Sequence, residues 1–132
     1  MKVLYLFFIV LGALCCQSLM GQVKFAASVQ HLGVVPEDTV HLPTVWFRYK
    51  NIGKTVTSVS RVKVSCGCLK AVYSSHPLLP GKSDSIRIIF NPAGHPGVFD
   101  RKVWVYFSGS PRPYELRLKG VVKAVERRRL YP

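Results

Sequence analysis

The 132-residue sequence has few acidic residues, few cysteines and no apolar run long enough to cross a membrane. It carries 6 Asp and Glu against 19 Lys and Arg, a net charge of +13. The longest apolar run, residues 3–14 with one glycine in it, is shorter than the roughly 20 residues of a transmembrane helix. Only 19% of residues are charged and 48% are hydrophobic, which excludes a wholly disordered chain. The length suits one domain and excludes a multidomain enzyme.

The sequence also lacks the common catalytic motifs. It has no nucleophile elbow, no His-Glu-x-x-His zinc motif and no glycine-rich phosphate loop. The six acidic residues are scattered along the chain, and the four histidines are solitary. We therefore expect no enzymatic activity and no cofactor.

The N-terminal segment has the order of a secretory signal peptide. Lys2 precedes the apolar residues 3–14, and polar and small residues begin at Gln17. Small side chains favour cleavage after Gly21, with Ser18 as the alternative. Cleavage after Gly21 leaves 111 residues with a net charge of +12. We expect an exported protein, periplasmic or associated with the cell envelope, with no transmembrane segment in the mature chain.

Four cysteines are present, and two of them precede this cleavage position. Lipidation at Cys15 or Cys16 is an alternative route to the membrane, although the residue before each of them is not small. The mature chain keeps Cys66 and Cys68, which in an oxidising compartment are expected to be paired, metal-bound or buried.

No run of ten residues has apolar side chains at helical spacing, and short alternating segments separated by Gly, Pro and Asn predict an all-β domain. The strands are expected near residues 23–35, 44–50, 55–64, 69–73, 85–90, 99–107 and 114–122. Broken alternation predicts a bulge near Val59 to Arg61. About seven strands suit an immunoglobulin-like β-sandwich. We assign residues 1–21 to a signal peptide, 22–123 to the sandwich and 124–132 to a basic C-terminal tail.

An ordered set of short motifs runs through the mature chain. The set is Leu32-Gly33, Phe47-Arg48-Tyr49-Lys50-Asn51-Ile52-Gly53, Ser65-Cys66-Gly67-Cys68, Leu79-Pro80-Gly81, Phe90, Gly97-Val98-Phe99 and Leu116-Arg117-Leu118-Lys119-Gly120-Val121. With these motifs the chain resembles the bacterial domain of unknown function 1573 family, of which Ser-Cys-Gly-Cys is the most specific element. The departures are Leu69 in place of Thr, and His31-Leu32 in place of an acid followed by Phe. The resemblance implies an exported immunoglobulin-like fold, related in shape to chaperone-pilin and ciliary ASH modules, but no established activity.

Cys66 and Cys68 are the residues with a claim to specific chemistry, and three interpretations stay open. In extended backbone their Cα atoms would be about 6.6 Å apart, near the limit for a disulfide, so we expect Gly67 to fold the segment through conformations closed to other residues. Such a bridge would be strained and labile, which suits thiol redox chemistry. Two thiolates also suit copper(I) or zinc, with His76 the nearest histidine in sequence. The third interpretation is a structural bend with two small, partly buried sulfurs.

Basic residues occupy the polar positions of the predicted strands: Arg48, Lys50, Arg61, Lys63, Arg87, Arg117 and Lys119. On one shared face they would attract polyanions, and otherwise they keep the protein soluble and its strand edges protected. Export and the lack of an RNA-binding motif disfavour nucleic acid. Arg127, Arg128 and Arg129 form a cluster past the last strand that could contact an anionic glycan or lipid surface.

The sequence as a whole favours a non-catalytic interaction or structural module of the cell envelope. Its expected partner is another envelope protein, bound by strand addition at an exposed sheet edge. The alternative is a thiol redox or metal-binding protein that acts through Cys66 and Cys68.

Overall fold

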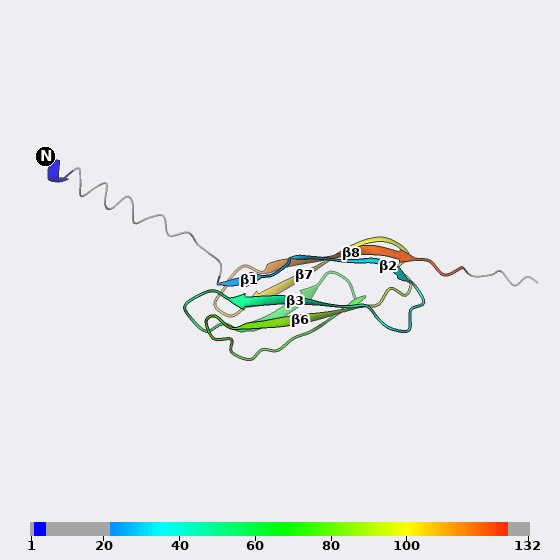
Figure 1. The fold of residues 1–132 in the computed structure, drawn as a ribbon, viewed down its shortest axis with the longest axis horizontal. Helices are drawn as coiled ribbons and strands as arrows, with labels where there is room; N and C mark the ends of the chain where they lie inside the picture. Colours follow the sequence, from blue (N-terminus) through cyan, green and yellow to red (C-terminus); the bar gives the residue numbers. More distant parts are fainter. Residues whose placement is uncertain (1, 5–21, 127–132) are drawn as a thin grey trace, which may run out of the picture.

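The protein is an eight-stranded β-sandwich, seen in a computed structural model that describes residues 2–4 and 22–126. The strands are β1 (Val23–Phe25), β2 (Val29–Pro36), β3 (Thr44–Asn51), β4 (Val59–Val64), β5 (Leu69–Val72), β6 (Ser83–Phe90), β7 (Gly97–Phe107) and β8 (Tyr114–Lys123). The chain enters the sandwich through β1 at one end and leaves after β8 at the other (Figure 1). Most of the predicted signal peptide, and Arg127, Arg128 and Arg129, lie outside the described residues. Among the described residues, no helix could span a membrane.

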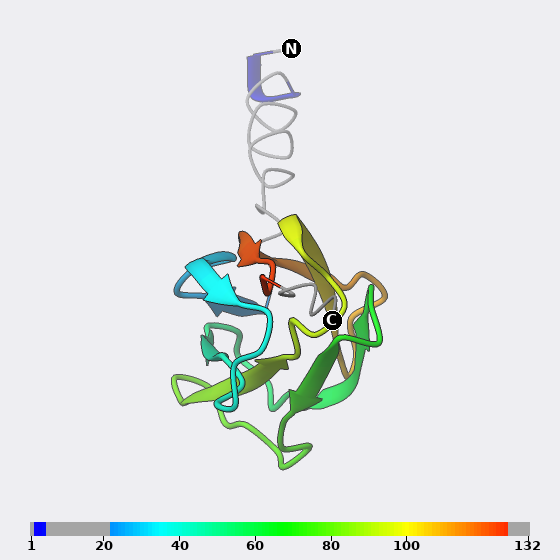
Figure 2. The same cartoon turned by 90° about the vertical axis from the view of Figure 1, so that its right-hand side faces the viewer.

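Two four-stranded sheets make up the layers, with strand orders β1-β3-β6-β5 and β2-β8-β7-β4. Figure 2 views these layers from the end at which β8 finishes. All strand pairs are antiparallel except β2 with β8, which is parallel. The predicted all-β sandwich is confirmed. Its eight strands agree with the expected number of about seven, and the opening segment divides into β1, in one sheet, and β2, in the other.

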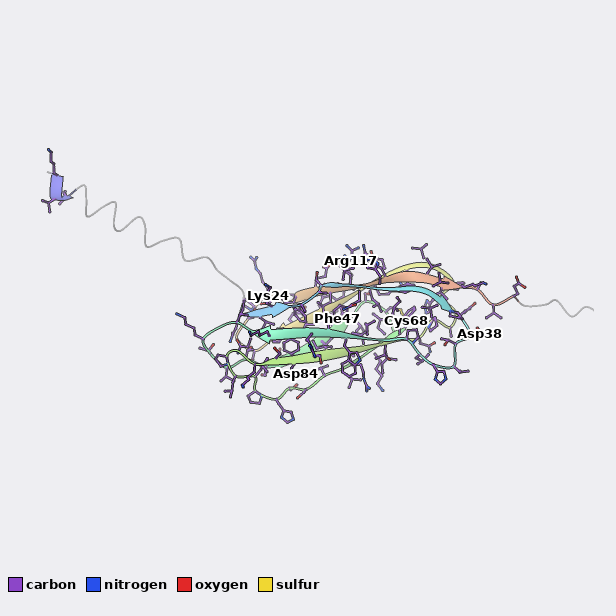
Figure 3. The ribbon with its side chains drawn as sticks, in the orientation of Figure 1. Lys24, Asp38, Phe47, Cys68, Asp84 and Arg117 are labelled. Carbon is purple, nitrogen blue, oxygen red and sulfur yellow. A yellow bond between two sulfur atoms is a disulfide. The ribbon has the colours of Figure 1, made fainter. Side chains whose placement is uncertain are left out.

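Alternate side chains of the long strands fill the space between the sheets. Those with no exposed surface include Phe47, Ile86, Ile88, Phe90, Val103, Val105 and Leu116. Phe47 points into the interior, whereas Arg117 points away from the outer side of β8 (Figure 3). The buried apolar residues of the described chain all lie between Val23 and Val122. Residues 22–126 therefore contain the whole core of the described chain.

Strand β4 shows the predicted bulge. Its register against β7 shifts between Val59 and Arg61, because Ser60 has no pairing partner on β7. This extra residue returns the side chains that follow it to the alternation that faces the interior. The strand begins at Val59 rather than at Thr55. Before it, Thr57 forms an isolated bridge with Leu78 of the β5–β6 connection, because this part of the chain crosses between the sheets.

A buried asparagine, Asn51, stabilises the turn at the end of β3. Asn51 has no exposed surface, and its side-chain amide donates to the carbonyls of Thr55 and Leu78, both at 2.9 Å. Its side-chain oxygen accepts a hydrogen bond from the Gly53 N–H at 3.0 Å. A Cβ atom at Gly53 would lie 2.5 Å from Cγ of Gln22, so a side chain there would displace the Gln22 side chain, which donates to Thr55. Asn51 thereby joins its own turn to the distant β5–β6 connection at Leu78.

We expect the substitution Asn51→Ala to lower the free energy of unfolding by about 2–4 kcal/mol, because three hydrogen bonds made by a side chain with no exposed surface would be lost. Asn91→Ala provides the matched control. The Asn91 side chain also accepts from the N–H two residues on, at 3.1 Å, but it is exposed. Its loss should cost less than about 1 kcal/mol. Urea unfolding measures both values, and equal losses would contradict the role assigned to Asn51.

Candidate functional site

The Ser-Cys-Gly-Cys segment is the turn that carries the chain from one sheet to the other. Strand β4 ends at Val64, and β5 begins at Leu69. The Leu69 N–H donates to the carbonyl of Cys66 at 3.1 Å, which closes a tight turn. Within it Cys66 and Cys68 are joined by a disulfide, with their Cα atoms 5.1 Å apart. Cys68 is buried and donates its N–H to Sγ of half-buried Cys66 at 3.1 Å.

Gly67 does not have the role expected of it. Its φ angle lies outside the left-handed region that five other glycines of the described chain occupy. A Cβ atom built at this position would meet nothing within 4 Å. The Cα atoms of the two cysteines come together because the turn closes between Cys66 and Leu69, in a backbone conformation that other residues can adopt.

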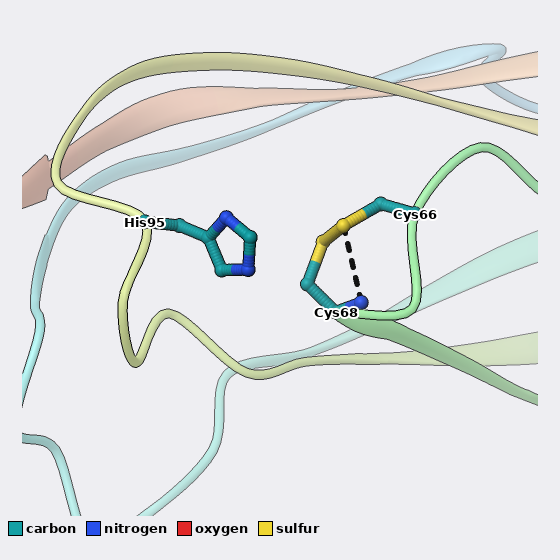
Figure 4. Close-up of side chains that lie close together, drawn as sticks. All are labelled: Cys66, Cys68 and His95. Carbon is teal, nitrogen blue, oxygen red and sulfur yellow. Dashed lines mark hydrogen bonds between the residues drawn. A yellow bond between two sulfur atoms is a disulfide. The ribbon is translucent and has the colours of Figure 1, made fainter.

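His95, not His76, lies beside the cysteines. Figure 4 shows its imidazole ring next to the disulfide. The two sulfurs and a ring nitrogen of His95 all lie within 4.8 Å of one another. Strand pairing explains this proximity: Leu69 pairs with Phe90, and the Asn91 N–H donates to the Cys68 carbonyl at 2.8 Å, so the loop after β6 begins beside Cys68.

The position of His95 could have been anticipated only from the pairing of β5 with β6. Sequence distance gave His76, in the β5–β6 connection, as the nearest histidine, yet no cluster of the described residues includes it with the sulfurs. His95 stands in a loop held by its own N–H, which donates to the Pro92 carbonyl at 3.0 Å. While the disulfide is intact, neither sulfur is a thiolate ligand. Two-electron reduction would give two thiols beside one imidazole, a soft three-ligand set.

The same turn leaves part of β7 without a neighbour. Strand β4 pairs with β7 only from Val103 to Phe107, and the last contact is made by Ser65, whose N–H donates to the Lys102 carbonyl at 3.0 Å. The chain then leaves for β5. Within the described part of the chain, residues 97–101 of β7 pair with β8 on one side and with no strand on the other. This segment is an open sheet edge.

An exposed row of three valines crosses the outer face next to this edge. Val98 pairs with Val121, and Val121 pairs with Val34 on β2. Their exposed fractions are 85%, 39% and 69%. A bulge in β2 causes the exposure of Val34: the register shifts between His31 and Val34, which turns Val34 outward and Val35 into the core.

Glycines accommodate this bulge. Gly33 has a φ of 68°, in the left-handed region. A Cβ atom at Gly120, opposite the bulge, would lie 2.8 Å from the Gly33 carbonyl oxygen and 2.7 Å from the Phe99 ring. The Leu-Gly and Lys-Gly-Val motifs of the sequence are thus two sides of one structural feature, which the sequence patterns did not reveal.

The outer face of the β2-β8-β7-β4 sheet carries the three ion pairs found among the described residues. Asp100 accepts hydrogen bonds from the Arg117 guanidinium, and Lys119 lies 4.0 Å away. The hydrogen bond from Arg117 lowers the pKa of Asp100, and in return the pKa of Arg117 is raised. Lys102 approaches Glu115 at 3.9 Å. These exposed pairs contribute little to stability, but they neutralise part of this face.

The basic strand residues do not share one face, so the condition for a single basic surface is not met. Arg61, Lys63, Arg117 and Lys119 belong to the β2-β8-β7-β4 sheet, and Arg48, Lys50 and Arg87 belong to the other sheet. On the first face Arg61 stacks on Tyr106, 4.4 Å from the ring centroid, and Lys63 lies 5.8 Å from the ring centroid of Trp104. Aromatic rings and carboxylates therefore engage most of its cations.

Comparison with solved structures shows the same fold in proteins of low sequence identity. A protein of unknown function from Porphyromonas gingivalis W83 superposes with a TM-score of 0.64 at 15% identity, over 81% of this chain and 51% of that one. The chain thus spans about half the length of that protein. The ASH/PapD-like domain 7 of human CEP192 gives 0.56 at 14% identity, over 80% and 87%. The CupB2 chaperone of Pseudomonas aeruginosa gives 0.52 at 14% identity, over 75% and 55%.

No protein with a curated function matches the sequence. The family described as "protein of unknown function (DUF1573)" matches residues 23–122, from the first strand to the end of the core. The match includes the Ser-Cys-Gly-Cys turn, the asparagine turn after β3 and both sides of the β2 bulge. The chain belongs to the DUF1573 family.

Proposed function

We propose that this protein is an exported, non-catalytic interaction module of the cell envelope that binds another protein by strand addition to β7. The open edge at residues 97–101 is the observation that carries this proposal. A row of backbone N–H and C=O groups without a strand neighbour is a template for an extended peptide.

The valine row gives the added strand an apolar contact. Val98 stands on the open segment itself, and Val121 and Val34 extend its apolar surface across the sheet. Side chains of an added strand would alternate between this face and the other, so every second residue of the partner segment should be apolar. Nearby cations, among them exposed Lys123, favour a partner segment that is flanked by acidic residues. The same sandwich occurs in the CupB2 chaperone, so the fold is compatible with a protein-binding role.

Site-specific photocrosslinking in envelope fractions tests the proposal. A photoreactive residue at Val98 should capture one envelope protein through an extended segment with apolar residues at alternate positions. The matched control places the same residue at Val40, which is 88% exposed in the β2–β3 connection. Val121→Lys should reduce the Val98 crosslink at least about tenfold, because it introduces a charge into the apolar contact.

Equal capture at Val98 and Val40 would contradict the proposal, as would a product formed only with a second copy of this chain. With the captured protein purified, amide hydrogen exchange of residues 97–101 should slow on binding. Unchanged exchange at these amides would exclude strand addition.

A second function is favoured by the proximity of His95 to both sulfurs. A dithiol reductant would convert the disulfide to two thiols, with transfer of two electrons and two protons, and would itself be oxidised to a disulfide. Cys66, Cys68 and His95 would then offer two sulfurs and one nitrogen to a soft metal ion, and binding would release both thiol protons. Copper(I) or zinc fits this donor set, and zinc would take a further ligand from solvent.

Metal titration of the reduced protein under anaerobic conditions tests this second function. We expect one equivalent of copper(I) or zinc to bind, with an affinity at least about tenfold lower in His95→Ala. His76→Ala, which removes the exposed histidine nearest in sequence, should bind as the parent does. Reduction should leave the fold intact, because a bridge between residues two apart contributes only about 1–2 kcal/mol. Equal affinity in both histidine variants, or no binding, would contradict a metal site.

A further inference from the structure

The outer face of the β1-β3-β6-β5 sheet is basic and has no ion pair among the described residues. Strand alternation directs five cations to it: Lys24, Arg48, Lys50, Lys70 and Arg87. All six carboxylate residues of the chain lie in the described part. The three ion pairs among the described residues are made by Asp100 and Glu115 of the opposite sheet, and none of them involves a cation of this face.

Asp84, the acidic residue whose pairing position is nearest to Arg48 and Lys50, points to the interior side of the sheet. Asp84 pairs with Tyr49 on β3, and Tyr49 is buried in the core. Burial first, and then the Asp84 charge, raise the pKa of Tyr49 to about 12, which places the carboxylate near the buried ring. Asp84 forms no ion pair with Lys24 or Lys50, whose charges remain on the outer face.

Two lysines stand directly opposite each other at one end of this face. Lys24 on β1 pairs with Lys50 on β3, and Arg48 lies two residues before Lys50, on the same side of β3. Like charges directly opposite each other across a strand pair are destabilising. The three cations border a shallow hollow of about 170 Å³, whose other lining residues are Ala26, Tyr49, Ile52 and Ser83.

A tetrahedral oxyanion suits this arrangement. An arginine fork can make two parallel hydrogen bonds to a phosphate group, and each lysine ammonium adds a point charge. Binding would also relieve the repulsion between Lys24 and Lys50. The hollow is open and shallow, so it can receive a phosphate group that projects from a larger surface.

Two exposed apolar side chains on the same face identify that surface. Trp46, two residues before Arg48, is 57% exposed and lies beneath the Arg87 guanidinium, 5.6 Å from the ring centroid. Ile52 lines the hollow and is 43% exposed. A tryptophan and an aliphatic side chain among unpaired cations suit the interface of a bilayer that carries anionic lipids.

We propose that the β1-β3-β6-β5 face docks on an anionic membrane surface, and that the hollow between Lys24, Arg48 and Lys50 holds a lipid headgroup phosphate. This contact is on the opposite sheet from the open edge of β7, so the module can bind a membrane and a protein partner together. The inference is independent of the proposed strand addition, because the two use different faces and different residues.

Vesicle binding by residues 22–126, which contain the complete core, tests the docking without the basic tail. We expect binding to vesicles that contain an anionic phospholipid and none to vesicles of zwitterionic phospholipid alone. The triple variant Lys24→Gln, Arg48→Gln and Lys50→Gln should lose binding by roughly fivefold per cation, about 100-fold in total. It should unfold at the same or a higher temperature, since the opposed lysines are gone.

The matched control removes one arginine and two lysines from the other sheet: Arg61→Gln, Lys63→Gln and Lys123→Gln. Both triple variants have the same net charge. An equal loss of binding in both would therefore show that binding depends only on overall charge, and it would contradict the proposed site. The chain extended to Pro132 should keep the difference between the variants, and its disappearance there would assign the contact to Arg127, Arg128 and Arg129 instead.

Tryptophan fluorescence gives a second readout. In a Trp104→Phe variant Trp46 is the remaining tryptophan, and its emission should shift to the blue on anionic vesicles. No shift would show that this face does not enter the interface. Binding of inorganic phosphate or of polyglutamate, without binding to anionic vesicles, would also overturn the proposal and assign the hollow to a soluble anion or an acidic peptide.

Discussion

Burial of every second side chain between two sheets determines which surface each remaining residue occupies. Because strands expose their residues alternately, packing Phe47, Tyr49 and their neighbours inside forces Trp46, Arg48 and Lys50 together on the outside. The same constraint on β7 and β8 places Val98 beside Val121. The surfaces that could bind partners are therefore consequences of the core, and a register slip of one residue would destroy both at once.

The alternation also explains what the sequence could predict. The inward side chains of β3, β6 and β8 follow a strict period of two, so their burial could be assigned residue by residue. The bulge in β4 was predictable because Val56 and Val59 cannot share a face with period two, whereas Val62 and Val64 can. The bulge in β2 was not, since its evidence is split between Gly33 and Gly120, which are far apart in sequence.

The sequence could not predict which residues lie close together across strands, for a related reason. His95 lies 27 residues after Cys68 and comes beside it through the pairing of Leu69 with Phe90. A pattern of alternation specifies which face a residue takes, but not which strands become neighbours. The division of the basic residues between two sheets was hidden in the same way, because strands with identical patterns belong to different layers.

The disulfide turn connects these features. By ending β4 at Val64 and sending the chain to the other sheet, it leaves residues 97–101 without a strand neighbour and sets both sulfurs beside the loop that leads into β7. The turn closes through a backbone hydrogen bond between Cys66 and Leu69, which does not depend on the bond between the sulfurs. The open edge should therefore persist when the cysteines are reduced, so protein binding and thiol chemistry can be separated although they share one end of the sandwich.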